Sequence, residues 1–395
     1  MAGQTVVILR TRQLGALDPF SMTRGESRFD RLPELSMEVE SLDHRRLANV
    51  SRSRDVVGIA SVMPMHLVAP VRSDVADRPT RKGVSWGVAE VGATRSKFTG
   101  KGVTVAVLDS GIDARHEAFA GVELAERDFT GEGNGDQNGH GTHCAGTILG
   151  KEVEEYRYSV APGVQRALIG KVLDKRGRGA TDALYGAILW ALDEGATVIS
   201  LSLAMDFPGY VSHLIGQGFP ADLATSKALE GYRTNMRLFD RLAELVRARG
   251  PFGRGAVIVA AAGNESRRDE CSLYDITVAP PAAADNVVAV GAVRKREGGE
   301  ALEVAGFSNS GANVAGPGVG VLSARSGGGY EVKSGTSMAT PHVAGVAALW
   351  AEKLLNQSGR LDCEELLARI VGTARSSPNL SPHDVGAGIV QAPEE

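Results

Sequence analysis

The sequence is poor in cysteine and aromatic residues, and it has no long apolar run. Its three cysteines, Cys144, Cys271 and Cys363, lie far apart in a chain of 395 residues, so a dense disulfide framework is excluded and one pair at most is left. No run approaches the length of a membrane-spanning helix. The formal net charge of -4 gives no reason to expect a nucleic acid or a membrane as partner.

A recognisable export signal is also missing. The N-terminus, MAGQTVVILRTRQLG, has an apolar patch that is short and followed by arginines, which is too little for the core of a signal peptide. If Met1 is the true start, we expect the protein to begin in the cytoplasm.

Glycine and apolar residues are plentiful, with 49 glycines and 43% hydrophobic residues, as expected for a large globular chain with many tight turns. From residue 84 onward, segments typical of buried strands alternate with segments typical of helices. Strands are expected at 103–108, 167–173, 197–203, 256–262 and 286–292, and helices at 181–194, 225–249 and 336–353. This alternation predicts an α/β fold with a mostly parallel sheet and helices on both faces.

The first 70 residues follow a different pattern and predict a small α+β unit. Its expected elements are strands at 4–11, 34–42 and 55–70 and a helix at 43–54. Residues 71–83 are polar and charged, so we interpret them as a linker that contains the processing region. The main domain is expected at 84–395.

Four polar residues stand where a parallel sheet places its functional sites, at the carboxyl ends of strands and the starts of helices. Asp109 and Asn264 each follow an expected strand, whereas His140 and Ser337 each open an expected helix. An acid, an imidazole, an amide and a hydroxyl that converge on one edge can carry out acyl transfer. Each residue alone is more often a cap or a turn former, so their joint occurrence is what favours catalysis.

These residues lie in four longer blocks. The blocks are VAVLDSGID at 105–113, NGHGTHCAG at 138–146, AAAGN at 260–264 and GTSMATPHVAG at 335–345. They resemble, in the same order, the signature blocks of the subtilisin-like serine proteases, the subtilases. HGTHCAG is similar to the proteinase K branch, and the resemblance runs over most of residues 84–392.

The resemblance implies a catalytic triad of Asp109, His140 and Ser337, with Asn264 as the side chain of the oxyanion hole. It also implies that an extended substrate pairs with two backbone edges and inserts one side chain into a specificity pocket. The edges are Gly177-Arg178-Gly179 and Ser202-Leu203-Ala204, and Ala261, Ala262 and Gly263 form a further wall of the pocket. The family usually has glycine in place of Ala204, so we expect its methyl group to crowd the pocket or shift the strand.

Two residues near His140 have alternative interpretations. His143 suggests a zinc pair with His140, but no third ligand cluster accompanies them, so we interpret His143 as a packed side chain. Cys144 is expected to be a small buried residue.

Calcium is a separate question, because subtilases often bind it in a loop after the catalytic histidine. Here that region, 148–159, lacks asparagine-rich ligands, and Asp113, Asp128 and Asp136 are expected to be solvated loop acids. We therefore expect that no cofactor is required. Structural calcium stays open, because the sequence identifies no site for it.

Subtilases commonly carry an N-terminal prodomain that blocks the active site until it is cut. Residues 1–70 resemble one in arrangement, so we predict a zymogen that is inhibited by its own N-terminal segment and cleaves itself within 66–84. The alternative is a permanent extra domain.

The chain is longer than a typical subtilase at about 205–250. We expect a loop at 205–222 that walls or lids the cleft, followed by an amphipathic helix at 228–250 that faces the core. Its apolar face would contain Leu229, Tyr232, Met236, Phe239, Leu242 and Val246.

The sequence thus predicts a monomeric serine endopeptidase that hydrolyses polypeptides through an acyl-enzyme on Ser337. Two alternatives stay open. A peptide ligase or macrocyclase would share the acyl-enzyme, and a catalytically silent scaffold would share only the fold. Localisation is undecided, since the family is mostly secreted and no signal is visible.

Overall fold

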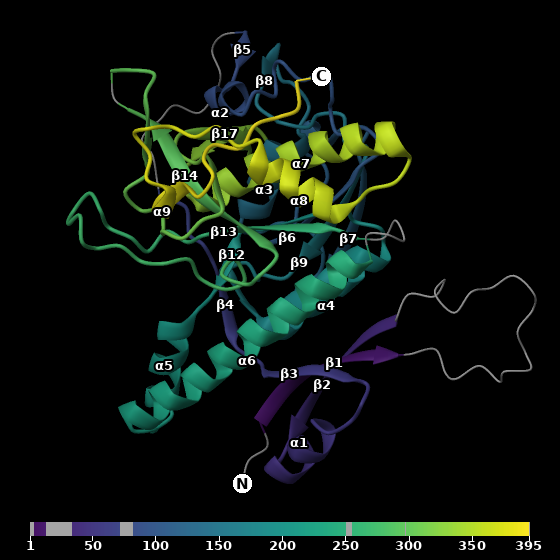
Figure 1. Ribbon diagram of the computed structural model, residues 1–395, viewed down its shortest axis with the longest axis vertical. Helices are drawn as coiled ribbons and strands as arrows, with labels where there is room; N and C mark the ends of the chain where they lie inside the picture. The colour runs from purple at the N-terminus through teal and green to yellow at the C-terminus, as the bar shows by residue number, and fades with distance from the viewer. Residues whose placement is uncertain (1–3, 13–33, 72–81, 250–254, 297, 395) are drawn as a thin grey trace, which may run out of the picture.

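The computed structural model describes residues 4–12, 34–71, 82–249, 255–296 and 298–394 (Figure 1). Its centre, among these residues, is an eight-stranded sheet in the order β15-β14-β13-β11-β6-β9-β7, with β16 beside β14. Only β15 pairs antiparallel within it. The strands are β6 Thr104–Asp109, β7 Glu123–Asp128, β9 Arg166–Lys171, β11 Val198–Leu201, β13 Val257–Ala261, β14 Val287–Lys295, β15 Leu302–Val304 and β16 Val314–Pro317. The predicted α/β fold is confirmed.

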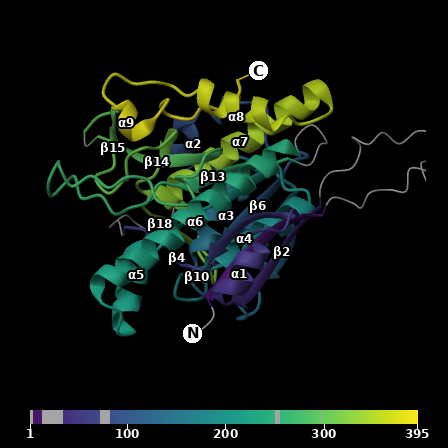
Figure 2. The same ribbon diagram turned by 60° about the horizontal axis from the view of Figure 1, so that its bottom comes forward.

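Each strand of this sheet contributes to two cores, one on each face, because successive side chains point to opposite sides. In β6, Val105 and Val107 join the core that contains α3 (His140–Leu149) and α7 (Thr336–Ser358). Ala106 and Leu108 join the core that contains α4 (Thr181–Asp193) and α6 (Ala221–Ala248). Figure 2 shows α8 (Cys363–Gly372) above strands β13 and β6 of this sheet and α4 below them. Burial on both faces explains the continuous apolar runs in the sequence.

The N-terminal segment forms its own antiparallel sheet, in the order β2-β1-β3. The strands are β1 Gln4–Arg12, β2 Glu34–Leu42 and β3 Val56–Ser61, and α1 (His44–Val50) packs on them through Leu47 and Val50. Asp43 caps α1 by accepting a hydrogen bond from Arg46 N at 2.8 Å. This sheet lies beside α4 and α6 (Figure 1).

The predicted strand at 55–70 is wrong as a single element. It ends as β3 at Ser61, and β4 (Pro64–Leu67) leaves the N-terminal sheet to pair with β10 (Arg178–Ala180) and β12 (Leu203–Met205). The break lies at Met63, whose N–H donates to Thr181 Oγ1 at 3.1 Å and whose carbonyl accepts from Thr181 N at 3.0 Å. Most of the predicted linker, 72–81, lies outside the described residues.

The insertion at about 205–250 is helical, so the expected loop at 205–222 is wrong. Asp206 accepts from Gly209 N at 2.8 Å and begins α5 (Phe207–Gly216), which packs against α6. The core-facing helix is confirmed, and Phe239, Leu242 and Val246 of its predicted apolar face are buried. Leu229 is 56% exposed, whereas Asn235 is fully buried.

Shorter elements complete the described fold. They are β5 Gly83–Val84 paired with β8 Tyr156–Arg157, β17 Val321–Ala324 paired with β18 Tyr330–Lys333, α2 Trp86–Glu90, α9 Pro382–Val385 and a 3-10 turn at Glu117–Phe119. Cys144, Cys271 and Cys363 are all free thiols. Within the described ranges, no helix combines the length and the apolar character that crossing a bilayer requires.

Candidate active site

Asp109 and His140 form a buried ion pair at the C-terminal edge of the sheet. Asp109 ends β6 and His140 begins α3, and His140 Nδ1 lies 2.8 Å from Asp109 Oδ1 and 3.0 Å from Oδ2. Both side chains are 1% exposed. A carboxylate at this distance fixes the imidazole with its Nδ1 protonated, so Nε2 is the nitrogen that accepts a proton when the imidazole is neutral.

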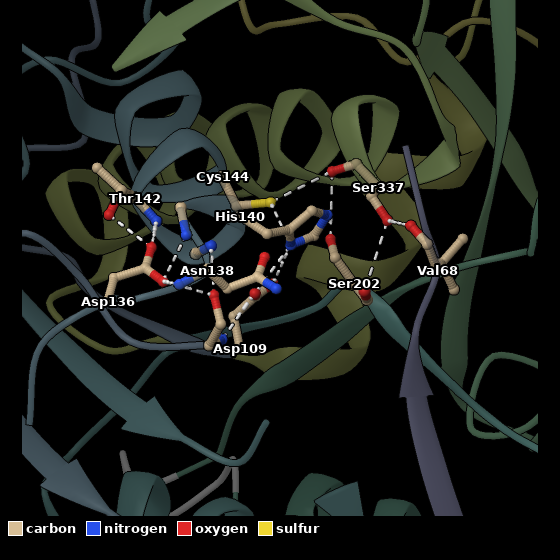
Figure 3. A network of polar contacts seen from close by, with 12 residues as sticks. Val68, Asp109, Asp136, Asn138, His140, Thr142, Cys144, Ser202 and Ser337 are labelled. Atoms are coloured by element: carbon tan, nitrogen blue, oxygen red, sulfur yellow. Dashed lines mark hydrogen bonds and ion pairs between the residues drawn. The ribbon is translucent and has the colours of Figure 1, made fainter. Parts of the chain in front are cut away.

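Ser337 lies on the other side of the imidazole, on the first turn of α7 (Figure 3). Its hydroxyl donates to the carbonyl of Val68 at 2.9 Å, with a second acceptor, the carbonyl of Ser202, at 3.5 Å. Nε2 of His140 is buried and has no hydrogen-bond partner among the described residues. The structure therefore brings the three predicted residues together, but the serine hydroxyl points to Val68 and not to the imidazole.

The N-terminal segment runs through the site as an extended strand. β4 pairs antiparallel with both edges that the sequence assigned to substrate, β10 on one side and β12 on the other. Leu67 N donates to Gly177 O at 2.8 Å, and Val68 N donates to Ser202 O at 3.4 Å. Beyond the serine, Val71 N donates to Ser334 O at 2.7 Å. Residues 64–71 thus cross Ser337 with their backbone held on both sides.

Val68 fills a small apolar pocket at this crossing. Its side chain is 1% exposed and packs with Ala204, Ala261 and Ala279. Two of the predicted pocket residues, Ala204 and Ala261, therefore line it. Ala262 and Gly263 follow Ala261 in the chain, where Gly263 N donates to Thr336 Oγ1 at 3.2 Å.

Asn264 presents its amide N–H to the same segment. Its Oδ1 accepts from Thr336 N at 2.8 Å and from Thr336 Oγ1 at 2.9 Å, and this fixes which end of the amide faces the cleft. Nδ2 then donates to the carbonyl of Ala69 at 2.9 Å. Sequence reasoning missed Thr336, although its place directly before Ser337 was a usable signal.

Charges in the site favour a protonated imidazole in this state. Burial opposes the charged form of His140, but the negative charge of Asp109, assisted by Cys144, outweighs it and raises the pKa of His140 above its usual value. Burial lowers the pKa of His143 well below its usual value, so His143 is a neutral, packed residue as predicted. Cys144 is buried, with Sγ 3.5 Å from the carbonyl of Ser337.

Potential metal ligands meet at two places among the described residues. One is the site itself, where Cys144 joins Asp109 and His140. The other contains Asp275, His383 and Asp384, where Arg268 donates to both carboxylates at 2.7 Å and already compensates their charge.

The comparisons with known proteins agree with this arrangement. Residues 100–388 match the model of the subtilase family, a span that contains all four predicted catalytic residues. The chain is 36% identical over 285 residues to "Subtilisin-like protease 1" of Pseudogymnoascus destructans, which covers 68% of this chain and 58% of that protein. It is 34% identical over 309 residues to "Intracellular serine protease" of Paenibacillus polymyxa, covering 75% and 81%.

A third relative, "Thermophilic serine proteinase" of a Bacillus species, is 32% identical over 277 residues, covering 69% of this chain and 58% of that protein. The chain thus spans less than two thirds of the length of two of these three relatives. The sheet, the buried Asp–His pair and the family match over most of the main domain together lead to one conclusion: the chain belongs to the subtilase family.

Proposed function

We propose that this chain is a serine endopeptidase made as a self-processing precursor. Ser337 is the nucleophile, His140 the general base and acid, and Asp109 the group that orients the imidazole. Asn264 Nδ2 and the backbone N–H of Ser337 form the oxyanion hole. The observation that supports this best is the peptide of residues 64–71, which lies across Ser337 with the Val68 carbonyl against the hydroxyl.

Hydrolysis then proceeds in two stages. Oγ of Ser337 attacks the carbonyl carbon of the bound peptide while Nε2 of His140 accepts the hydroxyl proton. The C–N bond breaks, the imidazolium gives that proton to the leaving nitrogen, and an ester on Ser337 remains. Water, deprotonated by the same Nε2, then attacks the ester, releases the new carboxylate and restores the hydroxyl. No organic cofactor takes part.

The first bond to be cut is Val68–Ala69, within the expected region 66–84. Val68 occupies the pocket, its N–H is on Ser202 O and its carbonyl is on Ser337 Oγ. The next bond, Ala69–Pro70, is a tertiary amide whose leaving group is the ring nitrogen of Pro70, and the side chain of Ala69 is exposed. In the precursor, Asn264 holds the Ala69 carbonyl. Cleavage therefore requires the Val68 carbonyl to turn from Ser337 Oγ toward Asn264 Nδ2.

The same segment explains inhibition before cleavage. Its strand pairing occupies both substrate edges, and burial of Val68 closes the pocket. The N-terminal sheet strengthens this occupancy because it is anchored to α6. Asn235 Nδ2 donates to Ser61 O at 2.8 Å, and Asn235 Oδ1 accepts from Tyr185 Oη at 3.0 Å. We assign residues 4–68 the role of a prodomain on these contacts.

The insertion begins beside the start of the bound segment. Asp206 N donates to Pro64 O at 3.0 Å, and α5 begins at the next residue. We propose that α5 walls the cleft there and restricts which residues bind several positions before the cut. Replacing 207–218 by a short glycine–serine turn should broaden the cleavage of unfolded proteins. An unchanged cleavage pattern would argue against the wall.

Intact-mass analysis and N-terminal sequencing of purified protein test the proposal. The wild type should yield a product that begins at Ala69, whereas Ser337→Ala should stay intact. The exposed Ser272→Ala is the matched control and should be processed like the wild type. A product that begins at Pro70 would place the cut one bond later. Processing of Ser337→Ala at the wild-type rate would refute Ser337 as the nucleophile.

Two further measurements separate the alternative functions. A fluorophosphonate should label Ser337 in processed protein, and absence of labelling would favour the silent scaffold. With a peptide substrate and an added peptide amine, hydrolysis gives free carboxylates, whereas a ligase gives joined peptides. Predominance of joined peptides in the mass spectrum would replace the endopeptidase by the ligase.

A further inference from the structure

A buried lysine lies directly behind the Asp109–His140 pair and has no role in the scheme above. Lys171 ends β9, in register with Asp109 of the neighbouring strand, and it is 1% exposed. Its Nζ donates to Gln137 Oε1 at 2.7 Å, to Ser110 O at 3.2 Å and to Gly135 O at 3.4 Å, and it forms an ion pair with Glu132 Oε2 at 3.6 Å. A buried ammonium is retained only when such partners compensate its desolvation. These partners join the strand end after Asp109 to the loop that leads into His140.

The same loop contains Asp136, which caps α3. The residue before the helix, Gly139, has no side chain that could cap it. Asp136 Oδ1 accepts from Gly139 N at 2.7 Å and Asn138 N at 3.1 Å. Asp136 Oδ2 accepts from Thr142 N at 2.9 Å and Thr142 Oγ1 at 2.6 Å. The carboxylate therefore holds the backbone on both sides of His140 (Figure 3).

Ser110 connects this cap to Asp109. Its hydroxyl donates to Asp136 Oδ1 at 2.9 Å and accepts from Gly141 N at 3.0 Å, one residue after His140. Its backbone N–H donates to Asp109 Oδ1 at 2.7 Å, the same oxygen that faces His140 Nδ1. Ser110 is fully buried. One residue thus contacts the acid, the cap and the helix that carries the base.

We propose that Lys171, Ser110 and Asp136 form a positioning network that sets the distance and orientation of His140 relative to Asp109. The effect of this network on catalysis rests on the proposed function, because the network acts through His140 and touches no substrate. Asp136 fixes the start of α3, Ser110 fixes that start to Asp109, and Lys171 fixes the intervening loop to the strand end. Small displacements of a base lower the rate of proton transfer without changing substrate binding.

Because Asp136 and Lys171 carry opposite charges, the network can be tested on the pKa of His140, which a purely structural role would leave unchanged. Removal of the negative charge of Asp136 destabilises the imidazolium, whereas removal of the positive charge of Lys171 stabilises it. Other groups near His140 remain in both variants. Asp109 faces it from β6, Cys144 and His143 share α3, and Lys333 of β18 donates to Gly139 O at 3.2 Å. The two variants should therefore shift the titration of His140 in opposite directions.

The experiment compares Asp136→Asn and Lys171→Met with wild type in two formats. In processed enzyme, kcat of Asp136→Asn should fall about 10- to 100-fold with KM within about twofold, because charge-assisted hydrogen bonds are lost. In unprocessed Ser337→Ala protein, NMR should show the pKa of His140 lower by roughly half a unit in Asp136→Asn and higher by a similar amount in Lys171→Met. Lys171→Arg retains the charge and should leave that pKa near the wild-type value.

Ser326→Ala is the matched control. It removes the hydrogen bond of Ser326 Oγ to the backbone carbonyl of Asp136, at 2.7 Å, but leaves the carboxylate in place. Its kcat and the titration of His140 should match wild type. If Lys171→Met does not fold, Asp136→Asn and Lys171→Arg decide the question by themselves.

Two results would overturn the proposal: an unchanged pKa of His140 in Asp136→Asn, or a kcat of this variant within twofold of wild type. A change in melting temperature with neither effect would reduce the network to a structural cap. The NMR format needs no catalysis. An inactive wild type would therefore overturn the endopeptidase proposal and leave the positioning of His140 to be decided by titration.

Discussion

The pocket around Val68 predicts how the rate of self-cleavage depends on the residue before the cut. Val68 is 1% exposed and packs with Ala204, Ala261 and Ala279, so its side chain is enclosed among small apolar residues. The perturbations are Val68→Ala, which empties the pocket in part, and Val68→Phe, which overfills it. Ala204→Gly enlarges the pocket by one methyl group.

The expected sizes follow from burial and packing. Val68→Ala removes two methyl groups from a buried site, worth about 1.6 kcal/mol at about 0.8 kcal/mol each, so cleavage should slow about 15-fold. Val68→Phe overpacks an enclosed site at about 1–3 kcal/mol, which corresponds to about 5- to 150-fold slower cleavage. Valine should therefore be faster than both smaller and larger residues. Ala204→Gly should recover part of the loss in Val68→Phe because the added carbons gain space.

The assay follows conversion of purified precursor by gel electrophoresis and intact mass. Val71→Phe is the matched control, since Val71 is 43% exposed in the same segment and its only described backbone bond, from N to Ser334 O, is retained. It should be processed within about twofold of wild type. Cleavage of Val68→Phe at the wild-type rate, or no recovery by Ala204→Gly, would refute the assignment of this pocket.

Three more predictions test the site and the core. Asn264→Ala should lower turnover roughly 10²–10³-fold, a size taken from subtilisin, because the amide that Thr336 orients is lost; a loss below tenfold in steady-state kinetics would exclude it from the oxyanion hole. Since the pKa of His140 is raised while residues 64–71 cover the site and the base must be neutral, self-cleavage should slow as pH drops through a value above 6.5; a midpoint below 6.5 would contradict this. Burial lowers the pKa of His342 to about 4, so only the unfolded chain binds its proton between pH 6.5 and 4, and stability should fall by about 3 kcal/mol over that range. Urea unfolding of His342→Gln should show a smaller loss, and an equal loss would assign the effect elsewhere.

The sequence alone predicted which polar residues meet at the C-terminal edge of the sheet, and the reason is physical. Asp109 ends a strand that is buried from Val105 onward, and His140 and Ser337 lie in the first turns of helices that follow glycine. Such signals are local, and the topology of a parallel sheet brings strand ends and helix starts to one edge. The meeting of Asp109 and His140 could therefore be predicted without any long-range contact.

The insertion shows where local signals failed. Pro208 and Gly209 lie in the expected loop, but proline is favoured in the first turn of a helix and Asp206 caps that turn. In α6, the apolar pattern predicted a buried Leu229 and gave no reason to bury Asn235. The amide is buried because Ser61 and Tyr185, far away in sequence, supply its hydrogen-bond partners.

The prediction of a single strand at 55–70 was wrong for a related reason. Its composition is that of a strand throughout, and the structure uses both halves as strands, in different sheets. The change occurs where Thr181 satisfies the backbone of Met63. Apolar periodicity reports that a segment is extended, but it does not report which edge the segment pairs with.

The position of the serine proton connects this pairing to catalysis. A hydroxyl has one proton to donate, and in this structure Ser337 donates it to the Val68 carbonyl. The imidazole nitrogen that should receive this proton is buried with no hydrogen-bond partner among the described residues. While this contact lasts, the hydroxyl cannot be activated by His140, although every group is within the site. Under the proposed function, the bound segment restrains the enzyme twice, because it occupies both backbone edges and diverts the proton of Ser337. Rotation of the Val68 carbonyl toward Asn264 would free the Ser337 hydroxyl to donate its proton to His140, so that the reaction could begin.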